Sequence, residues 1–513
     1  MDTPDTDARY LALSARDARF DGVFFVGVTS TGVYCRPVCR VRTPKAGNCR
    51  FFDHAAQAEA AGFRPCLRCR PELAPALGGG PMPWNHEDAS RLLAHEAARL
   101  LRAQVEQGAG DDEGLHQIAA RLGVSERHLR RIFRQHWGTG PLQFLQTLRL
   151  LNAKLLLTDT RLPVPMVASL SGFASQRSFH AAWKARYGLP PLQLRRSAGE
   201  NADTPGAPLP EAFSFRLDYR PPLDRERLLN FLAQRTIDGV DFVQPDHPIA
   251  QWGSTLRLRQ AGHTHTGWVV AAFDAERPHV LLRVAGSLAP VLPQVLQRVR
   301  HALDLDLQPD AVARALGRDF HNAEGQRLPG ALDGFMQAVR AVLGQQVTVA
   351  AARTLARRVA QRFGEPIATP WPGLERLFPT AHSIAQASED GMGELGVTRQ
   401  RQAALRALAI ALESGELRLD SDAPVQATIE RLKSLPGIGD WTAHYIAMRA
   451  LHWPDAFVAG DVALHHALGL RGLNVRQASR EAERRAEAWR PWRAYAVMCA
   501  WLGGTRSSEE TPT

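Results

Sequence analysis

The sequence predicts a multidomain, mainly α-helical protein with two small regions of mixed or irregular structure. The chain has 513 residues, which is enough for about three or four domains. Two stretches, residues 78–83 and 199–210, are rich in Gly and Pro and are typical of linkers. Alternating apolar residues, the pattern of strands, occur at about 255–284, and the chain from 309 onward has helical patterning.

The composition is that of a globular protein with an excess of positive charge. Charged residues make up 22% and apolar residues 45% of the chain. No apolar run approaches the roughly 20 residues that a membrane span needs, so no membrane partner is expected. The N-terminal residues lack the basic and apolar regions of a signal peptide, so we expect a cytoplasmic protein at the bacterial nucleoid. The net charge is +10, and because the excess lies in the first 200 residues we expect phosphate binding there.

Five of the six cysteines fall between residues 35 and 69. Two close pairs, Cys35 with Cys39 and Cys66 with Cys69, are separated by a loop and suit one tetrahedral zinc site with four thiolate ligands. Four unconnected buried thiols are the less favoured alternative. Residues 1–77 are therefore predicted to be a zinc-dependent domain. Cys49 is interpreted as a bystander, and Cys499 as a buried packing residue.

The same segment resembles the N-terminal methyl-acceptor domain of the Ada family. The likeness rests on Phe24 to Tyr34 followed by Cys-Arg-Pro-Val-Cys, and on the run from Ala60 to Cys69. It implies that Cys35, the first ligand, takes a methyl group from a DNA methylphosphotriester. Loss of one negative charge from the zinc site would then raise the affinity for DNA.

Residues 85–198 are predicted to be all-helical and contain two similar helix-turn-helix units. Each has a short helix, a Gly turn and a Ser before the second helix, first around Leu115–Ser125 and again around Val164–Ser175. The pair resembles the AraC-type DNA-binding domain, which implies promoter DNA and RNA polymerase as partners. Candidate DNA contacts lie on the second helices, although each side chain fits a solvated helix face equally well: Arg127, Arg130, Arg131, Gln176 and Arg177.

Residues 211–308 are predicted to form a small α+β domain, and residues 309–507 an all-α domain. The helical part contains Leu435-Pro-Gly-Ile-Gly-Asp-Trp-Thr-Ala-His-Tyr445, followed by Asp461. Glycines allow a tight turn, and the unpaired amides at the start of the next helix form an anion site. Leu435, Gly437 and Gly439 are thus candidate DNA contacts. A plain helix cap is the alternative.

Several motifs in this half resemble helix-hairpin-helix DNA glycosylases of the AlkA type, the DNA-3-methyladenine glycosylase II family. Besides the hairpin, they are Leu328-Pro-Gly330, Ala341-Val-Leu-Gly-Gln345, Asp455-Ala-Phe457 and the run from Trp489 to Tyr495. The small α+β domain matches the one that precedes the catalytic helices in that family.

The resemblance implies roles for individual residues. Asp461 is the catalytic carboxylate, although a lone Asp is more often a helix cap. The base pocket is lined by Trp441, Tyr445, Trp501 and Phe231, with a core role for Phe231 equally open. Trp441 stands where lyase-type relatives carry a lysine, so simple hydrolysis is expected. Gln346 is a further candidate DNA contact, because it stands where this family has the leucine that wedges into the duplex, and glutamine could fill that gap with hydrogen bonds.

Together these features predict an enzyme that excises alkylated bases such as 3-methyladenine from double-stranded DNA, combined with an Ada-like sensor and transcriptional activator. The alternative is mainly a regulator whose glycosylase half serves as a DNA-binding scaffold. Repair of guanine at its exocyclic oxygen is excluded, because the Pro-Cys-His-Arg motif of that methyltransferase is missing from the sequence. We expect a monomer.

Overall fold

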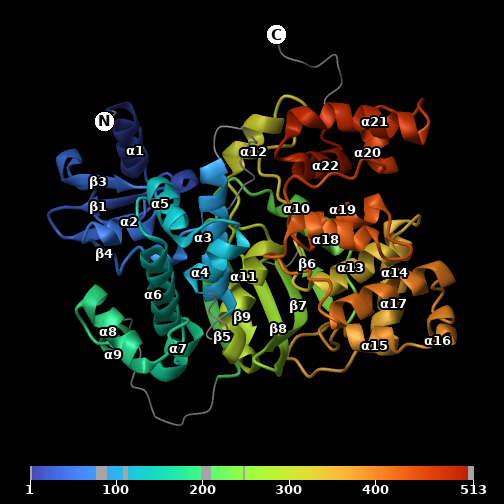
Figure 1. The fold of residues 1–513 in the computed structure, drawn as a ribbon, viewed down its shortest axis with the longest axis horizontal. Coiled ribbons are helices and arrows are strands. Elements are labelled where there is room, and N and C mark those ends of the chain that lie inside the picture. Colours follow the sequence, from blue (N-terminus) through green and yellow to red (C-terminus); the bar gives the residue numbers. More distant parts are fainter. Residues whose placement is uncertain (1–2, 77–88, 108–113, 198–209, 246–248, 506–513) are drawn as a thin grey trace. The chain divides into compact units, whose positions relative to one another are not determined.

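The computed structural model describes residues 3–76, 89–107, 114–197, 210–245 and 249–505 (Figure 1). The predicted linkers lie largely outside these ranges, as do the predicted boundaries at residues 77, 85, 198 and 507. The chain divides into two compact units. Unit 1 comprises Met1–Pro221, Arg259–His265 and Glu276–Gln297, and unit 2 comprises Pro222–Leu258, Thr266–Ala275 and Arg298–Thr513.

Unit 1 begins with a small mixed domain around a four-stranded sheet of order β3-β1-β2-β4. Strand β1 pairs antiparallel with β2 and β3, and β4 pairs parallel with β2. The elements are α1 (Thr3–Ala15), β1 (Phe25–Val28), β2 (Val33–Cys35), β3 (Cys49–Phe52), α2 (Ala55–Ala60) and β4 (Arg64–Pro65), with 3-10 turns at Ala18–Phe20, Ala46–Asn48 and Pro71–Leu73.

The register of β2 and β4 brings two cysteines together. Tyr34 pairs with Pro65 in this parallel ladder, so the residues that follow, Cys35 and Cys66, leave the sheet at the same end. The remaining cysteines of each pair follow within one turn. The close spacing in sequence thus becomes one cluster in space.

The helical part of unit 1 repeats one unit twice. Ser125 caps the second helix of the first unit by accepting from the His128 amide at 3.2 Å, and Ser175 caps its counterpart by accepting from the Ser178 amide at 3.1 Å. The helices are α3 (Ala89–Gln107), α4 (Leu115–Arg121), α5 (Glu126–Trp137), α6 (Pro141–Asp159), α7 (Val164–Leu170), α8 (Gln176–Tyr187) and α9 (Pro191–Ser197). The predicted tandem helix-turn-helix is confirmed.

Buried charges join the cysteine domain to these helices within unit 1. Glu59 is 2% exposed and accepts from the Tyr34 hydroxyl at 3.1 Å and from the Thr147 hydroxyl at 2.8 Å. Lys154, also buried, is ion-paired to Glu72. A buried charge is tolerated only when it is paired and hydrogen-bonded, so these contacts hold the two parts in one arrangement.

The predicted α+β segment contains a five-stranded sheet of order β5-β9-β8-β7-β6. In β5 the side chains of Phe213, Phe215 and Leu217 are buried while Ser214 and Arg216 are exposed, the alternation of a one-sided strand. The predicted strands within 255–284 are present and longer than expected. The elements are β5 (Ala212–Asp218), α10 (Arg225–Ala233), β6 (Asp241–Gln244), β7 (Gln251–Gln260), β8 (His263–Phe273), β9 (His279–Ala285) and α11 (Leu292–Ala302), with a 3-10 segment at Gly286–Val291.

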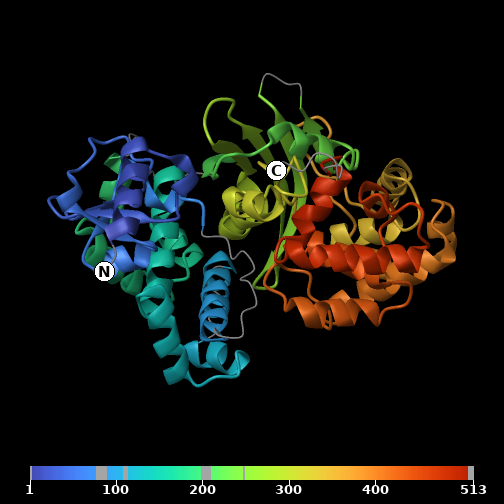
Figure 2. The ribbon, with the colours of Figure 1, turned by 90° about the horizontal axis from the view of Figure 1, so that it is seen from above.

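From residue 309 the helix is the one regular element of the described chain, with no named strand, as predicted for an all-α domain; this part runs from yellow to red in Figure 1, and Figure 2 shows its helices from above. Two apolar cores form, one around α13, α14, α17 and α19 and one around α20 to α22. The helices are α12 (Pro309–Leu316), α13 (Gly334–Leu343), α14 (Val349–Phe363), α15 (Ala381–Ala385), α16 (Glu389–Gly393), α17 (Arg399–Glu413), α18 (Val425–Lys433), α19 (Asp440–Arg449), α20 (Val462–Ala467), α21 (Val475–Ala486) and α22 (Arg493–Trp501). Among the described residues, no helix is both long and apolar enough to cross a bilayer.

Candidate active site and metal centre

The predicted hairpin lies between α18 and α19. Gly437 has φ +74°, which favours glycine, and a Cβ at this position would also lie only 3.0 Å from the Ala404 Cβ. Leu435 is 7% exposed and its side chain packs into the core, whereas Gly437 and Gly439 are exposed. Gly439 is the N-cap of α19, so the free amides of that helix begin at the exposed turn.

Asp461 accepts three hydrogen bonds through its half-buried carboxylate. It is the N-cap of α20, and Oδ1 accepts from the Leu464 amide at 2.7 Å. The Trp501 indole Nε1 donates to Oδ1 at 2.9 Å, and the Trp441 indole Nε1 donates to Oδ2 at 3.0 Å. The structure thus unites the two alternatives for this residue, because Asp461 is a helix cap whose carboxylate also binds two aromatic side chains.

Two of the predicted pocket aromatics, Trp441 and Trp501, contact this carboxylate, and the third, Tyr445, packs against both of them. The Trp441 and Tyr445 rings are stacked, with centroids 5.1 Å apart and an interplanar angle of 14°. Trp501 meets Tyr445 edge-on at 6.1 Å. All three are half-buried, so they form a continuous aromatic surface beside Asp461.

Phe231 lies deeper, with 2% of its surface exposed. The Arg235 guanidinium lies 3.7 Å from its ring centroid and the Arg449 guanidinium lies 4.8 Å from it. Arg449 also donates to the Tyr445 hydroxyl at 3.2 Å. Phe231 is therefore linked to the aromatic surface through arginine side chains, which agrees with the core role weighed for it.

The arginines were missed by sequence reasoning and they alter the electrostatics of the site. Burial lowers the pKa of Arg449 to about 10. Burial alone would raise the pKa of Tyr445, but the guanidinium groups of Arg449, Arg235 and Arg340 outweigh it and lower that pKa. Arg449 follows Tyr445 by four residues in α19, and this same-face spacing is the signal that would have revealed it.

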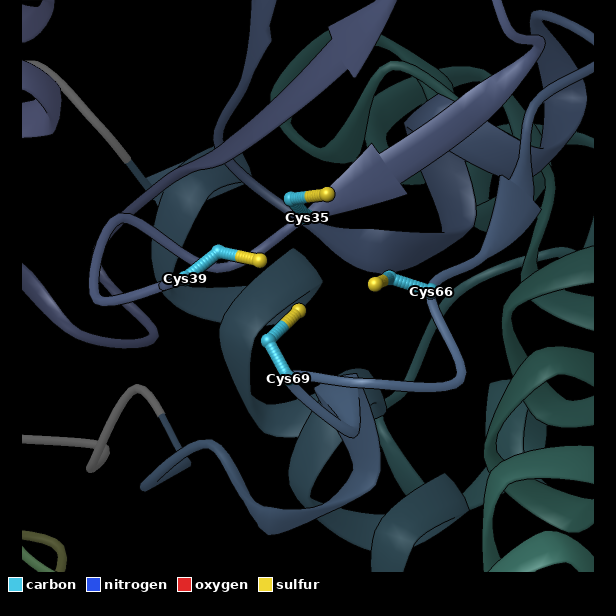
Figure 3. Close-up of side chains that lie close together, drawn as sticks. All are labelled: Cys35, Cys39, Cys66 and Cys69. Atoms are coloured by element: carbon cyan, nitrogen blue, oxygen red, sulfur yellow. The ribbon is translucent and has the colours of Figure 1, made fainter. Parts of the chain in front are cut away.

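The four predicted ligands form one cluster. The Sγ atoms of Cys35, Cys39, Cys66 and Cys69 all lie within 4.8 Å of one another and point toward a common centre (Figure 3). Zn–S bonds of about 2.3 Å in a tetrahedron place sulfurs roughly 3.8 Å apart, so this donor set fits Zn²⁺. Cys49 does not belong to the cluster, and its thiol donates to the Lys45 carbonyl at 3.4 Å. Burial raises the pKa of Cys499 to about 12, as suits an inert packing residue.

The predicted helix-turn-helix contacts are all exposed. Arg130 pairs with Glu126 at 2.5 Å, and the Arg131 guanidinium lies 3.2 Å from the His128 Nδ1. Arg127, Arg130 and Arg131 line one depression on α5, and Gln176 and Arg177 begin α8. Gln346, between α13 and α14, is exposed and adopts φ +54°, which is uncommon for a residue with a side chain.

Comparison with known families covers most of the chain. Four family models match in the predicted order: the metal binding domain of Ada at residues 8–72, a helix-turn-helix domain at 118–197, the AlkA N-terminal domain at 214–333 and the HhH-GPD superfamily base excision DNA repair protein at 339–493.

Individual relatives agree with this order. A protein of Mycobacterium tuberculosis named "Probable bifunctional transcriptional activator/DNA repair enzyme AlkA" is 36% identical over 97% of this chain and 96% of its own length. The chain belongs to this family. DNA-3-methyladenine glycosylase 2 of Escherichia coli is 34% identical over 56% of this chain and 96% of its own length. The Escherichia coli bifunctional transcriptional activator/DNA repair enzyme Ada is 32% identical over 38% of this chain and 50% of its own length.

Membership of this family indicates what the glycosylase site and the four-cysteine site bind. This member of the AlkA family carries DNA-binding helix-turn-helix and glycosylase domains. Its cofactor is Zn²⁺, for which the four-cysteine cluster is the fitting ligand set. The resemblance drawn from sequence is thereby confirmed at the level of the family.

Proposed function

We propose that this protein repairs alkylated DNA by hydrolytic excision of bases such as 3-methyladenine and couples this activity to Ada-like sensing of methylphosphotriesters. The observation that carries the glycosylase proposal is the Asp461 carboxylate, held by two indole N–H groups and one backbone amide beside stacked aromatic rings. The proposed domains, residues 1–77, 85–198, 211–308 and 309–507, follow the order of the matched families.

The chemistry follows from the charge on the substrate. A base alkylated on a ring nitrogen is cationic and leaves with the electrons of its bond to C1′, which develops positive charge on the sugar. A fixed carboxylate stabilises that charge without reorganising, usually the largest catalytic contribution. Asp461 would also accept a proton from the water that attacks C1′. The rings of Trp441, Tyr445 and Trp501 would contact the flipped base, since electron-rich faces attract cations.

Two observations support hydrolysis without strand cleavage. Trp441 occupies the place of the lyase lysine, and its N–H is used by Asp461. Lys433 is the sole lysine after residue 200 in the sequence, and its Nζ donates to Asp440 at 2.7 Å on the exposed side of the hairpin. The position of the lyase lysine therefore carries no amine, and the single lysine of this half is paired with Asp440.

We propose Cys35 as the methyl acceptor. Bound zinc keeps its thiolate ligands deprotonated at neutral pH. The Cys35 Sγ would form a bond to the methyl carbon as the methyl–oxygen bond of the phosphotriester breaks, leaving a phosphodiester anion. The backbone amide of Arg36 donates to the Cys69 Sγ at 3.4 Å, which reduces the nucleophilicity of that sulfur.

Transcription activation is the third part of the proposal. The exposed residues of α5 and α8 would read a promoter, and methylation of Cys35 would raise DNA affinity by removing one negative charge near phosphate. We propose RNA polymerase as the protein partner, a monomeric state, and action at the bacterial nucleoid. The alternative remains a regulator whose helical half only binds DNA.

Base release by purified full-length protein tests the proposal. Methylated duplex DNA should yield free 3-methyladenine with intact DNA strands. DNA binding with no release of any alkylated base would refute the glycosylase and favour the regulator. In parallel, mass spectrometry after exposure to methylphosphotriester DNA should place one methyl group on Cys35; methyl on another ligand would refute that assignment.

A further inference from the structure

The loop between α13 and α14 is tied to the hairpin by one side chain. Gln345 Nε2 donates to the Gly437 carbonyl at 2.8 Å and lies 3.0 Å from the Thr442 Oγ1. Gln345 and Gly437 are 92 residues apart in sequence, so this contact fixes two segments that local structure would not bring together. Both acceptors belong to the turn or first helical turn of the proposed DNA-gripping hairpin.

A second contact fixes the backbone of the same residue. The Arg401 guanidinium, at the start of α17, donates to the Gln345 carbonyl. The hairpin also rests on α17, because a Cβ on Gly437 would lie 3.0 Å from the Ala404 Cβ, closer than an ordinary van der Waals contact. Three segments, namely the loop, the hairpin and the start of α17, therefore meet at Gln345.

The two residues that follow Gln345 in this loop are exposed. Gln346 is exposed at φ +54°, and Val347 exposes 38% of its surface. On the other side of the contact, Thr442 adjoins Trp441, whose indole holds Asp461. Gln345 thus connects an exposed loop tip to the element that carries the carboxylate partner.

We propose that Gln345 is a positioning residue that fixes the loop tip, Gln346 and Val347, relative to the hairpin and the Trp441–Asp461 pair. This inference rests on the proposed glycosylase function. A flipped-out base is held only if the loop tip, the hairpin that binds phosphate and the Asp461 carboxylate all act on the same nucleotide. Since a misplacement of about 1 Å can cost roughly 100-fold in rate, loss of the anchor should be felt in duplex DNA.

The test compares two variants of the full-length protein. Gln345→Met keeps the volume of the side chain and removes both hydrogen bonds. Gln402→Met is the matched control, because it removes the same kind of bond, from the Gln402 Nε2 to the Val397 carbonyl at 2.8 Å, and Val397 does not belong to the hairpin. Single-turnover release is measured from a duplex with one alkylated adenine opposite thymine, and from one with the same adenine opposite an abasic site, where no base pair must be broken.

The expected result is a loss specific to the paired substrate. Gln345→Met should slow release opposite thymine by about 10- to 100-fold and release opposite the abasic site by less than about threefold. Gln402→Met should change both by less than about threefold. If Gln345→Met does not fold, Thr442→Val removes one of the two partners and should show the same selectivity at smaller size.

The outcomes separate the two proposals. Equal losses on both substrates, or no loss, would overturn the role of Gln345. Absence of release by the wild-type protein from either duplex would instead refute the glycosylase function on which this role rests.

Discussion

Replacing Trp501 with phenylalanine tests the arrangement around Asp461 most sharply. The change removes the indole N–H that donates to Asp461 Oδ1 at 2.9 Å but retains an aromatic ring beside Tyr445. The carboxylate keeps the donors from Trp441 and Leu464, yet loses one of the three that fix its orientation. We therefore expect the rate of the base-release step to fall.

The magnitude follows from the type of bond. A hydrogen bond to a charged group contributes about 1.5–3 kcal/mol. At about 1.4 kcal/mol per factor of ten, complete loss of that contribution from the transition state slows base release roughly 10- to 100-fold. Trp501→Phe should therefore reduce single-turnover release from methylated DNA within this range, with DNA affinity changed by less than about threefold.

Trp489 supplies a matched control in the same unit. Its indole Nε1 donates to the Asp319 Oδ2 at 2.8 Å, so Trp489→Phe removes the same kind of bond away from Asp461. This variant should lose stability and keep its rate of release. The reasoning is refuted if Trp501→Phe releases base as fast as wild type, or if Trp489→Phe slows release equally.

Three further predictions concern other parts of the chain. Borohydride should trap no covalent complex between the protein and abasic DNA, and a trapped adduct would contradict the hydrolytic mechanism. Lys433→Ala should leave the rate of base release within about twofold of wild type, because the Lys433 amine is paired with Asp440. Zinc chelation should unfold the cysteine domain, detected as loss of amide protection in β1 to β4, while base release persists; unchanged protection would show that zinc does not hold the domain. Burial lowers the pKa of His54 and of His301 from 6.5 to about 3. Between these two pH values the histidines are protonated in the unfolded chain and neutral in the folded chain. The free energy of unfolding therefore falls as the pH drops from 6.5 toward 3, by about 2 kcal/mol per histidine at pH 5. His54→Asn should flatten this dependence in urea unfolding, since His54 Nδ1 must stay unprotonated to accept the Ala56 amide; an unchanged slope would disprove the assignment.

Patterns that are local in sequence were readable before the fold was known. Close cysteine pairs predicted the four-thiol cluster, and the parallel pairing of Tyr34 with Pro65 provides its physical cause. Serine caps at Ser125 and Ser175 identified the two helix-turn-helix units. These signals depend on backbone geometry within a few residues, which sequence spacing records directly.

Contacts between distant residues were not readable in the same way. Trp441 and Trp501 were interpreted as stacking surfaces, and only the fold brings their indole donors to Asp461, 20 and 40 residues away. The anchor from Gln345 to Gly437 spans 92 residues. Arg235 and Arg449 lie against the ring of Phe231, which is buried. For a buried phenylalanine the sequence alone predicts apolar neighbours, because charged side chains are seldom buried.

The most direct test of the central claim is base release by the Asp461→Asn protein. Asparagine keeps the size of the side chain and can still cap α20, but it lacks the negative charge proposed to stabilise the sugar cation. The variant should bind methylated DNA as wild type does and release at least about 100-fold less 3-methyladenine per unit time. Release at a near-normal rate would contradict the account.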